Sequence, residues 1–356
     1  MSSPQIAAFL SCITTHLTDE EKYLFSKTHP AGITLFSRNI ENYQQLKSLI
    51  NEIKDTAGES TLIAIDQEGG RVRRLKEPDF IPYASQSQIG ALPKSQAKNI
   101  AKLHAKLIAY DLKKLGIDIN FAPVLDIAHT NTTPALNSRC FSSDKKVISD
   151  LGKISIDTYI SQGIIPCIKH LPGHGLAISD PHLNLPIINA SIKKLSEEFY
   201  PFQTCNYAPF GMTAHILLNA IDKQHPITQS KKGIKQLIRE EIGFDGFLIS
   251  DAIDMNALSG TISERAEKSL KAGCDCVCYC FGKIEQMQEL ANTCPKLSNN
   301  ALSRLDKAKQ ILHNKAKQAT FSQKQKYLSI MNNISAYNEK YDATEVLHQL
   351  QRKSQC

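Results

Sequence analysis

The chain has 356 residues, of which 42% are hydrophobic and 22% are charged, a composition typical of a globular protein with a large core. Its net charge of +7 is spread along the chain, which argues against a nucleic-acid-binding arm. The apolar run 6–13 is too short to span a bilayer and follows no basic segment, which argues against a membrane anchor or a secretory leader.

Ten cysteines in a chain without a leader are typical of free thiols in a reducing cytoplasm. We therefore expect a cytoplasmic monomer with no nucleic-acid or membrane partner. Four of the cysteines alternate from Cys274 to Cys280, and on a strand this spacing places all four thiols on one face. Zinc cysteines usually come in pairs on a turn, so we interpret the four as small buried hydrophobes of a strand.

Short apolar runs alternate along the chain with amphipathic stretches of helical length. The expected strands are, in chain order, 8–13, 32–36, 62–66, 117–122, 164–169, 210–214, 246–250 and 275–280. The expected helices are 44–56, 95–115, 147–162, 191–200, 232–242 and 263–272. Most of these strands are continuously apolar, as in a buried parallel sheet, and repeated strand–helix alternation implies the same arrangement.

Eight strands of this kind fit a closed (β/α)₈ barrel of the TIM type. An open doubly wound sheet is the alternative, but no Gly-rich dinucleotide motif follows any of the strands. After about Ser298 the chain is polar and helical, and from Thr320 it is rich in Lys, Gln and Ser. We therefore predict one α/β barrel domain over residues 1–318 and a helical or partly disordered tail over residues 319–356.

Charged and hydrogen-bonding side chains follow nearly every predicted strand. They lie in segments 66–74, 123–126, 137–141, 169–175, 213–215 and 250–255. In a barrel, the carboxyl ends of the strands converge on one mouth, where such groups would meet. A packed barrel does not need them, whereas a site for a polyhydroxylated ligand does, because each hydroxyl requires a fixed donor or acceptor. The pattern therefore predicts a sugar-binding site.

Six segments, in this order, resemble the short, single-barrel bacterial β-N-acetylglucosaminidases of glycoside hydrolase family 3. They are Gly-Ile-Thr-Leu-Phe-Ser-Arg-Asn (32–39), Ile-Asp-Gln-Glu-Gly-Gly-Arg-Val (65–72), Asn-Phe-Ala-Pro-Val-Leu-Asp (120–126), Lys-His-Leu-Pro-Gly-His-Gly (169–175), Asp-Pro-His (180–182) and Ser-Asp-Ala-Ile-Asp-Met (250–255). The resemblance implies a catalytic barrel and retaining hydrolysis of terminal, non-reducing β-linked N-acetylglucosamine. It also suggests a muropeptide substrate, N-acetylglucosamine linked to anhydro-N-acetylmuramic acid, in cell-wall recycling.

The resemblance also implies a role for each matched residue. Asp251 corresponds to the nucleophile, and His182 to an acid/base that Asp180 orients. The matched residues that hold the hydroxyls of the sugar or lie beside its pocket are Asp66, Arg74, Arg139, Lys169, His170 and Met255. One departure is Ala252, where the glucosaminidases often carry another acid, and we expect it to affect the support of the pocket rather than the chemistry.

These residue types suit the reaction. Retaining glycosidases usually use two carboxyl groups, but a histidine can replace the acid because its pKa is near neutral. Asp180 can select the tautomer of His182, and we expect Lys169 and nearby arginines to keep Asp251 ionised. The glycines and prolines of segment 172–181 predict a loop that can close over substrate, with His182 away from Asp251 when it is open.

Other roles remain open for several residues. Four histidines could instead form a metal site: His170, His174, His182 and His215. A zinc hydrolase needs three convergent ligands, and the resemblance argues against one, so we expect no metal and no cofactor. His174 is expected either to be structural or to contact the sugar. Asp126 and Asn120 are expected to support the site, and Glu68 to bond the backbone of its own turn.

Three functions other than an N-acetylglucosaminidase remain possible from the sequence. A β-glucosidase and an N-acetylglucosamine phosphorylase would use the same fold and the same covalent chemistry. A non-catalytic sugar-binding barrel is the alternative from another class of protein. The presence of Asp251, Asp180 and His182 together argues against this last reading.

Overall fold

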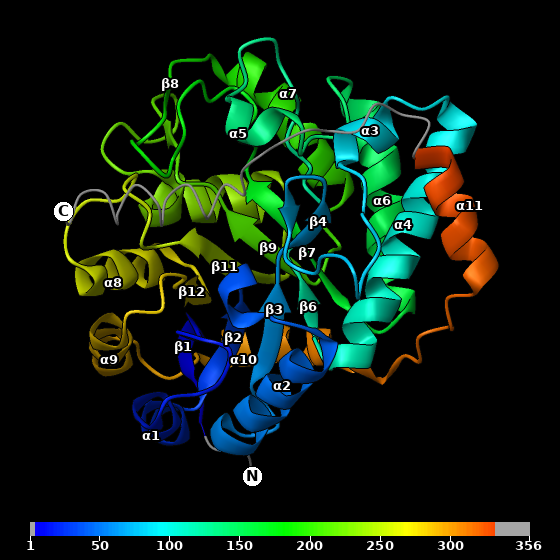
Figure 1. Ribbon diagram of the computed structural model, residues 1–356. Coiled ribbons are helices and arrows are strands. Elements are labelled where there is room, and N and C mark those ends of the chain that lie inside the picture. Colours follow the sequence, from blue (N-terminus) through cyan, green and yellow to red (C-terminus); the bar gives the residue numbers. More distant parts are fainter. Residues whose placement is uncertain (1–3, 332–356) are drawn as a thin grey trace, which may run out of the picture.

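The computed structural model describes residues 4–331, and residues 1–3 and 332–356 lie outside this description. Eight parallel strands close into a barrel in the order β1-β12-β11-β9-β7-β6-β3-β2 (Figure 1). They are β1 (Ile6–Ser11), β2 (Pro30–Leu35), β3 (Leu62–Ile65), β6 (Ile119–Asn120), β7 (Ile165–Leu171), β9 (Phe210–Thr213), β11 (Phe247–Ala252) and β12 (Cys276–Cys278). The predicted (β/α)₈ barrel is confirmed over the open sheet, because β1 pairs with β12 and closes the ring.

Helices surround this barrel (Figure 1). They are α1 (Asp19–Thr28), α2 (Tyr43–Ala57), α4 (Lys94–Leu115), α6 (Lys145–Ser161), α7 (Ile192–Thr204), the π-helix η3 (Gly233–Glu241), α8 (Ile262–Ala272) and α9 (Ile284–Thr293). All six helices expected from the sequence are present, and α1 and α9 were not predicted. Helix α1 buries only three of its residues, so it carries little of the apolar periodicity that marks a helix in sequence.

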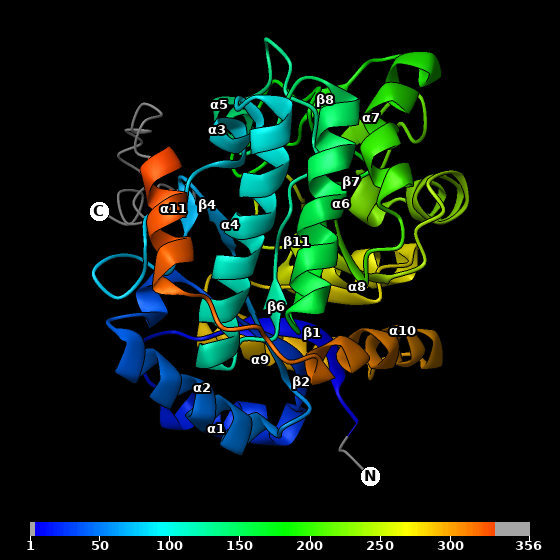
Figure 2. The same cartoon turned by 90° about the vertical axis from the view of Figure 1, so that its right-hand side faces the viewer.

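Helix α10 (Asn299–Lys309) closes the amino-terminal end of the barrel. Its residues Ala301, Leu305 and Ala308 belong to one buried cluster with interior side chains such as Phe9 and Ile165. Figure 2 shows α10 at one end of the barrel, and α3 (Gln86–Gly90), α5 (Pro134–Asn137) and β8 (Ile187–Ile188) at the other. The carboxyl end of the barrel is therefore the end that carries the elaborated loops.

Part of the predicted tail 319–356 is a helix, α11 (Phe321–Met331), which lies beside α4 (Figure 2). Tyr327 is completely buried, accepts a hydrogen bond from the Ala84 N–H at 2.9 Å and lies 2.8 Å from Nδ1 of His104. Residues 332–356 of the predicted tail lie outside the described residues. Among the described helices, none is long and apolar enough to cross a membrane.

A small hairpin at the carboxyl end of β3 was not predicted. It consists of β4 (Gln67–Gly69) and β5 (Val72–Arg73), which are antiparallel. The side-chain oxygen of Gln67 accepts the backbone N–H groups of Arg74 and Leu75, at 2.8 and 3.0 Å. Gly69 has a φ of +105°, and a Cβ there would lie 2.0 Å from the Ala84 carbonyl oxygen, so only glycine fits. The hairpin turns two sequence-predicted site residues, Asp66 and Arg74, toward the barrel mouth.

Candidate active site

A pocket of about 910 Å³, including its open mouth, lies at the carboxyl end of the barrel. All nine site residues predicted from the sequence line it: Asp66, Arg74, Arg139, Lys169, His170, Asp180, His182, Asp251 and Met255. They come from the ends of four strands, β3, β6, β7 and β11, and from the loops that follow. The barrel therefore gathers side chains that are up to 189 positions apart in sequence, 255 minus 66.

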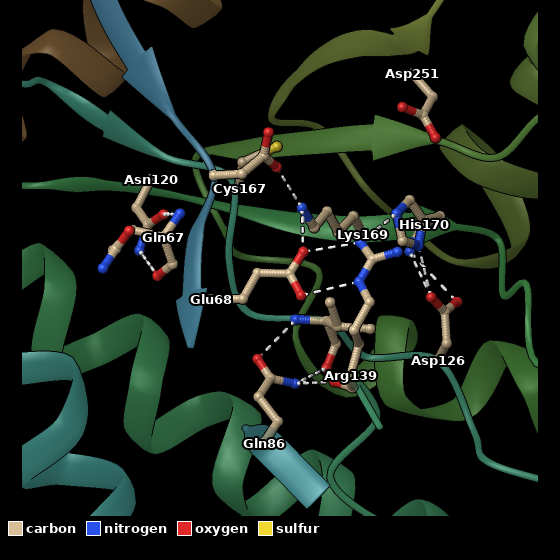
Figure 3. Close-up of polar contacts among 12 residues, drawn as sticks. Gln67, Glu68, Gln86, Asn120, Asp126, Arg139, Cys167, Lys169, His170 and Asp251 are labelled. Atoms are coloured by element: carbon tan, nitrogen blue, oxygen red, sulfur yellow. Dashed lines mark hydrogen bonds and ion pairs between the residues drawn. The ribbon is translucent and has the colours of Figure 1, made fainter. Parts of the chain in front are cut away.

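One side of the pocket is a buried charge network (Figure 3). Lys169 Nζ lies 2.7 Å from Asp66 and 2.6 Å from Glu68, and Arg139 donates two hydrogen bonds to Glu68 at 2.9 and 2.8 Å. Arg74 lies 3.4 Å from the second oxygen of Asp66. Burial alone would raise the pKa of Asp66, but Lys169 and Arg74 outweigh it and lower that pKa to about 2. Asp66 is therefore an ionised hydrogen-bond acceptor fixed at the pocket wall.

The prediction for Glu68 was wrong. Its carboxylate pairs with Lys169 and Arg139, and not with the backbone of its own turn. The reason is that residue 68 lies within the short buried strand β4 and not in the turn, and it is only 2% exposed. Burial would raise the pKa of Glu68, and the two cations lower it. Glu68 thus holds Lys169 and Arg139 in place.

His170 is oriented by Asp126, the residue predicted to have a supporting role. Nδ1 of His170 lies 2.7 Å from Asp126, which also accepts the backbone N–H of His174 at 2.7 Å. Because the carboxylate accepts a hydrogen bond from Nδ1–H, Nε2 of His170 is left as an acceptor, 3.4 Å from Arg139 Nη2. Figure 3 shows this pair next to the network of Lys169 and Arg139.

Asp251 lies near the carboxyl end of β11, apart from the network of Figure 3. Its Oδ1 accepts the Ala252 N–H at 2.8 Å. Burial would raise the pKa of Asp251, but His170, His215 and this N–H lower it below its ordinary value. The lowered pKa agrees with the prediction that Asp251 is ionised. The predicted cause, the charge of Lys169, does not hold, because Lys169 pairs with Asp66 and Glu68.

His182 and Asp180 form a close pair on the loop between β7 and β8. Asp180 Oδ1 lies 2.7 Å from Nδ1 of His182 and accepts its backbone N–H at 3.0 Å. Burial would raise the pKa of Asp180, and its hydrogen bond with His182 lowers it. The loop is docked, since the Ala257 N–H donates to the Pro181 carbonyl at 3.0 Å. The predicted open position is therefore not what the structure shows: His182 and Asp251 line the same pocket.

Two further residues of the pocket were not among the predicted site residues. His174 is buried, and within residues 4–331 neither ring nitrogen has a hydrogen-bond partner; burial lowers its pKa to about 4. Asp254 accepts the Cys280 N–H at 3.2 Å, while its Oδ2 has no partner in the same part of the chain. The sequence signal for Asp254 was a second carboxylate three positions after Asp251, in a segment already assigned to the mouth.

Asp254→Asn should change how stability depends on pH. Burial raises the pKa of Asp254 to about 6 in the folded protein, above roughly 3.9 in an unfolded chain. Its protonation therefore stabilises the fold at low pH, and this stabilisation is lost as the pH rises through about 6. From about pH 5 to about pH 8, the variant should gain on the order of 1 kcal/mol of unfolding free energy relative to wild type. Denaturant titrations of both proteins at each pH would measure this, and an unchanged difference would contradict it.

The prediction that four alternating cysteines share one face of a strand is only partly correct. Cys276 and Cys278 lie inside the barrel, whereas Cys274 packs in the outer core, because β12 begins only at Cys276. Cys274 is therefore not on the predicted common face. Cys278 and Cys280 line the pocket with their sulfurs 3.7 Å apart, and the cysteines described are all free thiols. Nowhere in residues 4–331 do three His, Cys, Asp or Glu side chains group closely enough to hold a metal ion.

Comparison with known proteins agrees with this architecture. Residues 5–313 match the model of the glycosyl hydrolase family 3 N-terminal domain. The chain is 34% identical over 290 residues to a β-hexosaminidase of Haemophilus influenzae, covering 80% of this chain and 81% of the relative. NagZ of Neisseria gonorrhoeae, solved with N-trifluoroacetyl-D-glucosamine, superposes with a TM-score of 0.84 at 30% identity, covering 93% of this chain and 99% of NagZ. A family 3 β-N-acetylglucosaminidase of Paenibacillus superposes with a TM-score of 0.83 at 27% identity, covering 92% of this chain and 67% of that one.

Proposed function

Because this chain belongs to glycoside hydrolase family 3 and is a glycoside hydrolase, we propose that it is a retaining exo-β-N-acetylglucosaminidase. It removes terminal, non-reducing β-linked N-acetylglucosamine. The observation that carries this proposal is that Asp251 and the Asp180–His182 pair line one pocket together with a fixed set of hydroxyl-binding charges. The names of its relatives, a β-hexosaminidase and a β-N-acetylglucosaminidase, support the choice of sugar.

Asp251 is the nucleophile in this proposal. Its lowered pKa keeps it ionised at neutral pH, and its position at a strand end of the barrel is rigid. The carboxylate attacks the anomeric carbon and forms a glycosyl-enzyme, which water then hydrolyses with net retention.

His182 is the general acid/base. Asp180 accepts a hydrogen bond from Nδ1–H, which leaves Nε2 to exchange a proton with the leaving oxygen and then with water. The carboxylate also stabilises the imidazolium, as the aspartate of a serine-protease triad does. The short loop thereby supplies a proton donor without a second carboxyl group.

The buried charges of the opposite side bind the hydroxyls of the sugar. Asp66 accepts hydrogen bonds, while Arg74 and Arg139 donate them. Lys169 has three N–H donors and uses two on Asp66 and Glu68, so one remains for the ligand. His170 offers its Nε2, and Met255 forms part of the apolar wall.

The setting of the reaction is also part of the proposal. We infer a cytoplasmic monomer that acts on N-acetylglucosamine linked to anhydro-N-acetylmuramic acid during cell-wall recycling. Free thiols and the similarity to NagZ support this reading. Residues 1–318 would form the catalytic barrel, and residues 319–356 a tail that begins with the docked helix α11.

Product analysis on two aryl glycosides, with and without phosphate, tests the proposed function. An aryl β-N-acetylglucosaminide should be hydrolysed much faster than the matching β-glucoside, and NMR should show the β-anomer as first product. Adding phosphate should not change the product. Faster glucoside cleavage would identify a β-glucosidase, and a sugar phosphate a phosphorylase. Binding by calorimetry without turnover would identify a sugar-binding barrel.

Activity should be unchanged after prolonged treatment with a chelator. Lys169 and Arg74 supply the fixed positive charge, and His182 supplies the proton, so no step requires a Lewis acid. The assay compares chelated and untreated enzyme on the same aryl β-N-acetylglucosaminide. A loss of activity that zinc restores would revive the histidine metal site.

A further inference from the structure

Ala252, the residue after the proposed nucleophile, is held on both sides by hydrogen bonds. Its N–H donates to Oδ1 of Asp251 at 2.8 Å, and its carbonyl oxygen lies 2.9 Å from Nε2 of His215. Ala252 has no polar side chain with which to anchor itself. The orientation of the N–H that stabilises the Asp251 carboxylate therefore depends on how the backbone of residue 252 is held, which involves His215 and the Met255 N–H, 3.1 Å from the same carbonyl oxygen.

The direction of these hydrogen bonds follows from the chemistry of the groups. A carbonyl oxygen only accepts, so Nε2 of His215 carries the proton. Burial lowers the pKa of His215, which is therefore neutral at neutral pH, and its Nδ1 accepts from the Thr228 hydroxyl at 2.7 Å. The Thr228 hydroxyl also lies 3.1 Å from the Ala214 carbonyl oxygen. It has only one proton to donate, and we assign that proton to the shorter hydrogen bond, with Nδ1 of His215 as the acceptor.

A second threonine extends this chain of hydrogen bonds to the neighbouring strand. The hydroxyl of Thr213, the last residue of β9, lies 2.8 Å from that of Thr228 and can donate to it. Thr213, His215 and Thr228 are each 0% exposed, so no water competes for these groups. The series of hydrogen bonds thus runs from Thr213 on β9 through Thr228 and His215 to the backbone of β11.

We propose that His215 is a positioning residue that fixes the Ala252 backbone and, through it, the carboxylate of Asp251. This inference rests on the proposed function, in which Asp251 attacks the sugar. Two other histidines act on Asp251 from different elements, His170 on β7 and His182 on the β7–β8 loop. Both line the pocket, whereas His215 does not, so its effect on the substrate is indirect.

Two substitutions at position 215 distinguish the effect of losing the hydrogen bond from the effect of changing the size of the side chain. His215→Leu removes the donor, whereas His215→Gln places an amide N–H close to the position of Nε2. We expect kcat of the Leu variant to fall by about tenfold to a hundredfold with little change in KM, because a small displacement of a reacting group has effects of this size. The Gln variant should retain activity within a few-fold of wild type.

The pH profile provides a readout that a purely structural role would not move. The acid limb of kcat/KM should shift to higher pH in the Leu variant, because a misaligned Ala252 N–H stabilises the ionised Asp251 less. Two titratable groups that face Asp251 from neighbouring elements, His170 and His182, are the same in both variants, and both variants lose the His215 ring, which also lowers the pKa of Asp251. The limb should therefore shift less in the Gln variant than in the Leu variant.

Thr228→Val and Thr228→Ser form a second pair of variants. They test the positioning role of His215 even if His215→Leu does not fold. The Val variant should show the same fall in kcat, and the Ser variant should not. Thr61→Val is the control: this buried hydroxyl binds the Pro30 and Ala57 carbonyls at the amino-terminal end of β3, so its loss should lower the melting temperature and leave kcat unchanged.

The outcomes are distinct. Equal activity of the folded Leu variant and wild type, or an equal loss in the Leu and Gln variants, would overturn the role of His215. If His215→Leu does not fold, equal activities of the two Thr228 variants would overturn it. A wild-type enzyme that does not cleave an aryl β-N-acetylglucosaminide would instead overturn the proposed function.

Discussion

Asp251→Ala should abolish turnover of an aryl β-N-acetylglucosaminide, with a loss on the order of 10⁴-fold or more. In the proposed mechanism, the substitution removes the group that forms the covalent bond, while the charges of Asp66 and Lys169 remain in the pocket. KM should therefore change much less than kcat. The fold should persist, because Asp251 faces the pocket and its carboxylate accepts the backbone N–H of its own neighbour, Ala252.

Asp118→Ala is a matched control for this loss of a carboxylate. Asp118 lies at the amino-terminal end of β6 and pairs with Lys54 at 2.9 Å, far from the pocket residues in the barrel. We expect it to lower thermal stability and to leave kcat unchanged. If Asp251→Ala instead lost stability in proportion to activity, the aspartate would be a structural residue and the nucleophile assignment would fail.

His182→Ala should show a loss that depends on the leaving group. For substrates with poor leaving groups, we expect a fall of roughly 10²–10⁴-fold, the usual contribution of a general acid. Activated aryl substrates need little protonation at this step, so their glycosylation should slow much less. Rate measurements over a series of aryl leaving groups would give a steeper dependence for the variant than for wild type.

Asp180→Asn and azide rescue complete this test. The Asn variant should weaken both chemical steps, because it loses the charge that supports the imidazolium. Azide needs no general base, so it should rescue the deglycosylation step of His182→Ala. An equal loss for good and poor leaving groups, or no rescue, would assign the acid/base elsewhere. Glu68 is a weak replacement, because it is engaged by both Lys169 and Arg139.

The barrel could be predicted because its strands are short, apolar and regularly separated by helices. The predicted site followed from the fold, since residues after parallel strands must meet at one mouth. Lys169 and Asp251 illustrate this: each lies at or near the carboxyl end of its strand. The roles assigned to these residues came from the family resemblance and stay predictions until the variants above are measured.

Other features could not be predicted because they depend on pairings between distant segments. Glu68 and Arg139 are 71 positions apart, and no local pattern shows that they form an ion pair. The β4–β5 hairpin has strands of only three and two residues, too short to produce a periodicity. The docked position of His182 involves a contact between Pro181 and Ala257, which sequence spacing does not show.

Covalent trapping tests the central claim most directly. A fluorinated N-acetylglucosaminide with a good leaving group slows hydrolysis of the glycosyl-enzyme more than its formation, so the intermediate accumulates. Peptide mapping by mass spectrometry should then find one added sugar, on the peptide that contains Asp251. A label on another carboxylate, or turnover of the reagent without any label, would contradict the assignment of Asp251 as the nucleophile of a retaining enzyme.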